Sequence, residues 1–212
     1  MTDSDMQPKW LLWARELQAA AQSGLTYAES PYDRARYADM QALAARMMAE
    51  GSDADLAVIE GLFAQQSGYA TPKVDVRGAI FREQSVLLVG EKLDGGRWTM
   101  PGGFADVNEA PSESLVREVR EEAGYVVKPR KLAAVYDRDK HGHPQPHPFH
   151  IYKLFFICDV VGQCEKSELE TGEARFFPLD ALPELSLPRV LPWQIHRMYE
   201  HLQSPSLPTD FD

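Results

Sequence analysis

The segment 111–124 constrains the fold more than any other part of the chain, because it predicts a two-sided helix. Proline stands at its first position and glycine just past its end, which is where helices favour these two residues. Leu115, Val116, Val119 and Ala123 recur at helical spacing and form one apolar stripe. A helix with such a stripe must be buried against another layer of the fold.

The same segment carries three carboxylates on a separate arc of the helix. Glu118, Glu121 and Glu122 lie three and four residues apart, so their like charges repel. They also fall in the last turns before Gly124, where the helix dipole disfavours negative charge. A solvated acidic face is the ordinary interpretation of a glutamate-rich helix. A bound divalent cation explains the repulsion better, because carboxylates are the hard donors that Mg²⁺ and Mn²⁺ prefer.

The residues around these glutamates form a longer pattern. Gly103 is followed by Glu109, then by Arg117-Glu118 and Glu121-Glu122, and then by a glycine. The spacing is G-x5-E-x7-R-E-U-x-E-E-x-G-U, where U is a bulky aliphatic residue. It resembles the Nudix box, and only the last position departs from the family pattern, because Tyr125 replaces an aliphatic residue.

The resemblance implies a fold, a cofactor and an activity. Nudix proteins are α/β proteins, an α/β/α sandwich around a mixed sheet, and they cleave a nucleoside diphosphate linked to a group X with Mg²⁺ or Mn²⁺. Carried onto this sequence, the metal ligands are Glu118, Glu121 and Glu122. Glu109 would position the box or reach the metal through water, and the Gly103 carbonyl would add a ligand. Arg117 would orient Glu121.

The general base is left open between three carboxylates. Hydrolysis of a pyrophosphate needs a group that takes a proton from the attacking water. Glu121 is one candidate within the box. Glu170 and Glu173 are others, because they stand in an acidic stretch just before a predicted strand. An ordinary acidic surface loop explains that stretch equally well.

Ahead of the box, residues 8–66 predict three helices. The first apolar stripe stops at Gly24 and the second at Gly51, and Ser52 or Asp53 is expected to cap the third helix. The composition of residues 66–73 predicts a linker. The sequence thus predicts a helical domain over 1–68, for packing or dimerisation, and a Nudix domain over 74–205. This order resembles the Nudix subgroup that contains CDP-choline pyrophosphatases, whose members are dimers.

After the linker the periodicity changes to that of strands. Alternating or β-branched runs predict strands at 74–81, 86–89, 131–136, 151–161 and 175–178, and a final helix is predicted over 190–202.

Several cationic and aromatic residues are candidates for binding the substrate. Residues 137–150 form a loop with four histidines and three prolines between two predicted strands. A substrate loop is favoured over a zinc site, because zinc sites often include cysteine and none is near; a plain exposed loop is the remaining alternative. The candidate substrate residues are Arg77, Arg97, Phe104, Arg138, Lys140 and His141.

The overall composition restricts the partners. A net charge of −10 argues against duplex DNA, which requires clustered Lys and Arg. The acidic N-terminus has no apolar core typical of a signal peptide, and no stretch is long enough to span a membrane. Cys158 and Cys164 provide no disulfide framework, which is typical of a cytoplasmic protein.

Three functions are compatible with these features. The first is hydrolysis of a CDP-choline-like compound to a nucleoside monophosphate and X-phosphate. The second is hydrolysis of ADP-ribose. The third is a nucleotide sensor that binds without turnover and contacts a partner through its helices. The complete carboxylate set argues against the sensor. In the first two cases the partner is a small nucleoside diphosphate derivative, and a homodimer is expected.

Overall fold

The computed structural model describes residues 8–144, 146–166 and 171–212, and these residues form two compact units. The helical unit contains the chain up to Lys73 together with Pro146–His150. The sheet unit contains the described residues of 74–145 and 151–212. The loop with four histidines is therefore divided between the two units.

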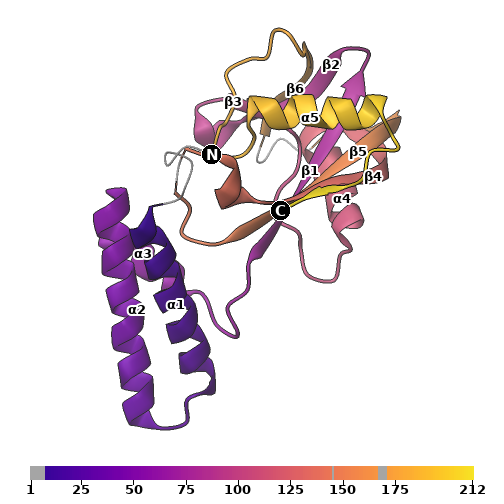
Figure 1. Ribbon diagram of the computed structural model, residues 1–212. Coiled ribbons are helices and arrows are strands. Elements are labelled where there is room, and N and C mark those ends of the chain that lie inside the picture. Colours follow the sequence, from indigo (N-terminus) through magenta and orange to yellow (C-terminus); the bar gives the residue numbers. More distant parts are fainter. Residues whose placement is uncertain (1–7, 145, 167–170) are drawn as a thin grey trace. The chain divides into compact units, whose positions relative to one another are not determined.

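The helical unit consists of α1 (Lys9–Tyr27), α2 (Pro31–Ser52) and α3 (Leu56–Ala64), as shown in Figure 1. The three predicted helices are confirmed. Their apolar stripes meet in one core, which also receives the ring of Phe149, 6.4 Å from that of Phe63. The buried members of this core are Leu11, Ala14, Ala44, Ala45, Met48, Ile59 and Phe63.

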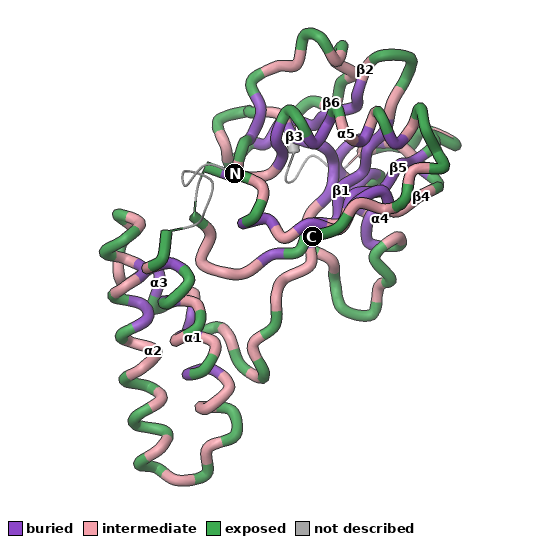
Figure 2. Tube along the Cα trace, viewed as in Figure 1, coloured by how far each residue is buried: buried purple, intermediate pink, exposed green. Residues whose placement is uncertain are grey.

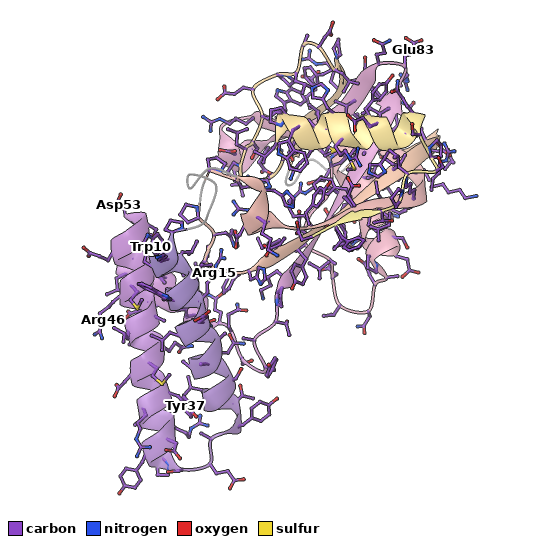
Figure 3. The ribbon with its side chains drawn as sticks, in the orientation of Figure 1. Trp10, Arg15, Tyr37, Arg46, Asp53 and Glu83 are labelled. Atoms are coloured by element: carbon purple, nitrogen blue, oxygen red, sulfur yellow. The ribbon has the colours of Figure 1, made fainter. Side chains whose placement is uncertain are left out.

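Two glycines that were expected to end helices lie inside them. α1 continues past Gly24 to Tyr27, and α2 continues past Gly51 to Ser52. A Cβ on Gly24 would lie 2.4 Å from the ring of Tyr37, and one on Gly51 would lie 2.3 Å from the ring of Trp10. Trp10 and Tyr37 occupy opposite ends of the α1–α2 pair (Figure 3). These glycines therefore make room for an aromatic ring of the facing helix, which is a packing role and not a stop signal.

The predicted cap of the third helix was also wrong by a few residues. Ser52 is the last residue of α2, and Asp53 follows it with a left-handed φ of 55°. The cap is Asp55, whose carboxylate accepts a hydrogen bond from the Ala57 amide at 2.8 Å. Asp is as good an N-cap as Ser, so propensity alone does not choose among neighbouring candidates.

The sheet unit begins with β1 (Lys73–Arg82), β2 (Ser85–Glu91), the 3₁₀ turn η2 (Lys92–Asp94) and β3 (Arg97–Thr99). Helix α4 (Pro111–Ala123) is followed by β4 (Tyr125–Asp137), the 3₁₀ turn η3 (Arg138–His141) and β5 (Ile151–Gln163). The unit closes with β6 (Thr171–Pro178), α5 (Pro192–Gln203) and β7 (Asp210–Phe211). Among the described residues, no helix is long and apolar enough to cross a membrane.

The strands form one mixed sheet. Within the described ranges the order is β3-β2-β1-β5-β4-β7, with β6 paired to β2. β7 runs parallel to β4, whereas β2 is antiparallel to β1, β3 and β6. Neighbouring residues of β1, β2 and β5 alternate between two apolar clusters, so the sheet is buried on both faces (Figure 2).

One helix covers each face of this sheet. Leu115 and Val119 of α4 pack into one cluster, and Ile195 and Met198 of α5 pack into the other. The predicted α/β/α sandwich, preceded by a helical segment, is thus confirmed. The fold brings the loop before α4 against β1, and this contact builds the site.

Candidate active site

Helix α4 is held in place by its apolar stripe and its two ends. Leu115 and Val119 are fully buried. At the start, the Glu113 carboxylate accepts a hydrogen bond from the Ala110 amide at 2.8 Å. At the end, Gly124 adopts a left-handed φ of 71° and its amide donates to the Arg120 carbonyl. The predicted end of the helix at Gly124 is confirmed.

The glutamates of α4 do not form a solvated acidic face. Glu118 and Glu122 are each only 8% exposed, while the Glu121 side chain is 43% exposed. Burial raises the pKa of Glu118, and it raises the pKa of Glu122 to about 7. Two desolvated carboxylates at the end of a helix require nearby positive charge, so the solvated interpretation is wrong for this pair.

The loop that precedes α4 runs along β1 and meets these carboxylates. The Gly78 amide donates to Pro101 O at 2.9 Å, and the Val76 amide donates to Gly103 O at 2.8 Å. From the other side, the Gly102 amide donates to Oε2 of Glu122 at 2.8 Å. A Cβ on Gly103 would lie 3.2 Å from Oε1 of Glu118, so this glycine allows the carboxylate to approach the loop backbone.

Arg117 joins the carboxylates of the box. Its Nε lies 3.0 Å and 3.2 Å from the two Glu109 oxygens, and its Nη1 lies 2.9 Å from Glu118 and 3.3 Å from Glu121. It also forms an ion pair with Asp106 at 3.1 Å. Arg117 therefore contacts Glu121 as predicted, but its shorter bonds go to Glu118 and Glu109.

The donor set suits a hard divalent cation chemically. It offers three carboxylates and a backbone carbonyl, two of the carboxylates being buried with too little positive charge around them. Within the described part of the chain, however, no three His, Cys, Asp or Glu side chains converge closely enough to hold an ion as they stand. Arg117 occupies oxygens of Glu118 and Glu121, so a cation would have to compete with its guanidinium.

Glu91 and Arg189 join the site, although neither is among the residues predicted from the sequence. Glu91 ends β2, is 9% exposed, and its charge is one of the causes that raise the pKa of Glu122. Nε of Arg189 lies 3.1 Å from Oε2 of Glu91. The available signal was a charged residue at the end of the apolar run SVLLVGE. Such a residue is more often a simple strand end.

The two distant base candidates differ in placement. Thr171 is the partner of Glu91 across β2 and β6, so β6 starts near the box carboxylates. Glu170 lies outside the described residues. The Glu173 carboxylate reaches Nε of Arg175 at 3.9 Å. Arg175 stacks on Trp98 and Phe177, which pack with the cluster under α5, so the ion pair of Glu173 lies with that cluster.

Four of the six candidate substrate residues are engaged within the protein. Arg77 is buried and binds Asp75 and Met100 O, whereas the exposed Arg97 binds Asp94 at 2.9 Å and Glu184 at 2.8 Å. Arg138 is 3% exposed and its Nε donates to the Pro188 carbonyl at 3.3 Å.

His141 binds Asp212 at 2.7 Å, and its ring lies 4.3 Å from that of Tyr136. The side chains of the remaining two candidates are exposed to solvent. Phe104, in the box loop, is 51% exposed, and Lys140 is also exposed. Of the six, Phe104 is the one that the chain places beside Gly103.

The histidines of the loop are divided between the two units. His143 is buried, with Nδ1 2.7 Å from Leu187 O, and burial lowers its pKa to about 3. His141 belongs to the sheet unit, whereas His147 and His150 belong to the helical unit. The helical unit holds that segment by a hydrogen bond from Arg15 Nε to His147 O at 3.1 Å.

Comparison with protein families gives two matches that together span most of the chain. The model described as the NUDIX domain matches residues 71–201. The model described as a UDP-X-like, N-terminal oligomerisation domain matches residues 8–63.

Among curated proteins, the chain is 44% identical over 207 residues to the Bacillus subtilis (strain 168) protein named "Putative ADP-ribose pyrophosphatase YjhB", covering 98% of this chain and 99% of that protein. It is 37% identical over 123 residues to the ADP-ribose pyrophosphatase of Methanocaldococcus jannaschii, covering 56% of this chain and 69% of that protein.

Solved structures are also similar to this chain. A UDP-X diphosphatase matches with a TM-score of 0.60 and 30% identity, covering 96% of this chain and 98% of that one. An ADP-ribose pyrophosphatase of Streptococcus suis matches with a TM-score of 0.60 and 36% identity, covering 67% of this chain and 100% of that one. The likenesses to the Bacillus subtilis protein and the UDP-X diphosphatase thus extend over the helical and the sheet units alike.

Proposed function

Since the chain belongs to the Nudix hydrolase family, with a UDP-X-like oligomerisation domain ahead of the Nudix domain, we propose that it cleaves the pyrophosphate of a nucleoside diphosphate linked to X. The products are a nucleoside monophosphate and X-phosphate. The observation that carries this proposal is the pair of buried glutamates against the Gly102-Gly103 loop.

The proposed metal ligands are Glu118, Glu121 and Glu122, with Gly103 O as a backbone ligand and Glu109 at the edge of the set. A divalent cation, Mg²⁺ or Mn²⁺, supplies charge neutralisation on the phosphates and a more acidic water when it is bound. Arg117 holds two of the carboxylates and Glu109 in one network, which limits their rotamers.

A side chain of this protein then accepts the proton that the attacking water loses. Water attacks phosphorus, a new P–O bond forms, and the bridging P–O bond breaks with its electron pair going to the departing phosphate. We assign the proton from water to Glu121, because its side chain is 43% exposed and so meets solvent, unlike its two buried neighbours. Glu170, in the acidic stretch of the sequence ahead of β6, remains the alternative.

The identity of X and of the base is a narrower proposal. Relatives that match the whole chain are named for ADP-ribose and for UDP-linked compounds, and the sequence of the helical segment suggests CDP-choline. All three are nucleoside diphosphates esterified on the β-phosphate. Phe104, exposed beside Gly103, is the aromatic surface proposed to stack on a base.

A substrate panel tests the activity. The protein is incubated with CDP-choline, UDP-glucose, ADP-ribose, NADH and nucleoside triphosphates, with Mg²⁺, with Mn²⁺ and with chelator, and products are followed by ³¹P NMR. Cleavage between the two phosphates that depends on metal is expected for at least one NDP-X compound. Binding without cleavage of any compound would instead support the sensor.

We also propose that the protein is a homodimer formed through the helical unit. The family model that matches residues 8–63 is described as an oligomerisation domain, and several large apolar side chains are exposed on this unit. Replacing Trp13, which is 57% exposed on α1, by glutamate is expected to shift sedimentation from twice the 23.9 kDa chain mass to the chain mass. The control Lys9→Glu should remain a dimer. If Trp13→Glu also remains a dimer, the interface lies elsewhere. The exposed set is Leu12, Trp13, Tyr27, Tyr32, Leu43, Val58 and Tyr69.

The cytosol is the proposed location. Cys158 and Cys164 are both free thiols, and Cys164 is exposed. Such a thiol is best preserved in a reducing compartment.

A further inference from the structure

A buried ionic group beneath the box loop has no part in the chemistry described above. It comprises Asp75 and Arg77 on β1 and Lys153 on β5, which are 5%, 6% and 2% exposed. Arg77 grips Asp75 with two bonds, Nη2 to Oδ1 at 2.7 Å and Nε to Oδ2 at 3.1 Å, and Lys153 Nζ binds Oδ2 as well. Buried ion pairs seldom add stability compared with apolar packing, so this one requires another explanation.

The third contact of Arg77 indicates what that explanation is. Its Nη1 donates to the carbonyl of Met100 at 3.1 Å, and Met100 is the residue at which the box loop begins. Burial lowers the Arg77 pKa, whereas the charge of Asp75 and, to a lesser extent, those of Glu122 and Glu118 raise it, so the box carboxylates favour the charged guanidinium. At 6% exposure it does not reach the surface.

We propose that Arg77, clamped by Asp75, is a positioning residue for the proposed hydrolysis. It fixes the Met100 carbonyl, and through it the loop whose Gly102 amide binds Glu122 and whose Gly103 carbonyl belongs to the proposed metal set. The inference rests on the proposed function. It also gives Arg77 a different role from the substrate binding that was predicted from the sequence.

The geometry of the loop explains why such a clamp is useful. Met100–Gly103 is bound by β1 along one edge and by Glu122 along the other. Gly102 has a φ of 137°, which glycine alone adopts readily. A flexible glycine pair costs conformational entropy to order. A guanidinium locked by two bonds to Asp75 is a rigid anchor for the first carbonyl of this loop.

Asp75 is the part of the clamp that keeps Arg77 oriented. Burial alone would raise the Asp75 pKa, but Arg77 and Lys153 lower it to about 2, so the carboxylate stays ionised at neutral pH. With one anion between two cations, the group retains positive charge, which partly offsets Glu118 and Glu122 above it.

The test replaces Arg77 by lysine, which keeps the positive charge. Lysine cannot make the bidentate hydrogen bond to Asp75 and the hydrogen bond to Met100 O at the same time. We expect kcat to fall by about 10-fold to 100-fold with KM nearly unchanged, the scale for groups that orient ligands. Without substrate, Mn²⁺ affinity measured by calorimetry should fall about 10-fold, and the Gly102 amide should exchange faster with deuterium.

The matched control is Arg197→Lys. Arg197 makes the same kind of bidentate hydrogen bond to Asp210, at 2.6 Å and 2.8 Å, and does not contact the loop. The control should change none of the three readouts. A rise in KM with kcat preserved would overturn the proposal in favour of direct substrate binding, and unchanged exchange and Mn²⁺ affinity would overturn it outright. If the wild type cleaves no compound in the panel, the proposed function fails, while exchange and Mn²⁺ affinity still decide this inference.

If Arg77→Lys does not fold, Asp75→Asn is measured in the same way. Asparagine retains one acceptor oxygen for Arg77, so smaller changes in the same directions are expected. Wild-type values for Asp75→Asn would likewise overturn the proposal.

Discussion

Glu122→Gln is expected to lower the rate of pyrophosphate cleavage by about 10²-fold to 10³-fold, the usual effect of removing one group that organises transition-state charge. At the same time the metal-free protein should become more stable at pH 8. The two effects have opposite signs because the same burial that prepares Glu122 for a cation makes its charge unfavourable without one.

The sign of the stability change follows from the pKa. The ordinary pKa of Glu is 4.5, and burial raises that of Glu122 to about 7 in the folded protein. The folded state therefore binds the proton more tightly, and the associated stability is present below pH 4.5 and lost as pH rises through 7. Glutamine resembles the neutral form at every pH and can still accept the Gly102 hydrogen bond. At about 1.36 kcal/mol per pKa unit, the gain at pH 8 is on the order of 3 kcal/mol.

Denaturant unfolding with chelator at pH 5 and pH 8 measures this effect, alongside initial rates with Mg²⁺. The control is Glu113→Gln, on the same helix, because glutamine also completes the cap at Ala110. The control should retain activity and show no such pH-dependent gain. A Glu122→Gln protein that is inactive and also less stable at pH 8 would indicate structural damage and contradict the proposed role.

Gly102→Ala should destabilise the sheet unit by about 3–5 kcal/mol, which places it among the most damaging single substitutions. Two causes combine. The φ of 137° is strained for any residue with a Cβ, and that Cβ would lie 2.0 Å from the Val76 carbonyl oxygen. The oxygen belongs to the backbone of a central strand, so it has little room to move. Relief requires the loop to leave β1, which also breaks the bond to Glu122.

Gly142→Ala separates strain from clash. Gly142 has a φ of 75°, also in the left-handed region, but a Cβ there would meet no atom within 4 Å. Its cost is expected to be about 1 kcal/mol, the strain alone. Thermal unfolding of both variants measures the difference. Equal losses for the two would mean that the loop is not packed against β1 as the structure describes.

The parts of the site that could be predicted are those coded by local spacing. The α4 helix, its end at Gly124 and the segregation of its glutamates all follow from a 3.6-residue period and one glycine. Glu91 could not be found in this way, because it ends β2 whereas Glu122 lies on α4, and its charge acts on Glu122 only once the helix has packed on the sheet. The same holds for the role of Arg77, whose partner Asp75 is also bound by Lys153, 78 positions further along the chain.

Glycine was the residue type most often misinterpreted. Gly24 and Gly51 carry the same local signal as Gly124, yet only Gly124 ends a helix. The difference lies in what packs against each residue, since Tyr37 and Trp10 lie over the first two. Local sequence does not encode the facing helix, so a stop and a close contact look alike.

The division of the His-containing loop has a topological consequence. Because Pro146–His150 belongs to the helical unit, the chain passes between the two units three times, after Lys73, before Pro146 and after His150. The helical unit is therefore connected to the sheet unit by more than one segment of the chain. Cutting the backbone between residues 66 and 73 would leave the Phe63–Phe149 ring contact and the Arg15 hydrogen bond to His147 in place. In this protein, deleting α1, α2 and α3 would also remove the packing partners of an internal segment, Pro146–His150.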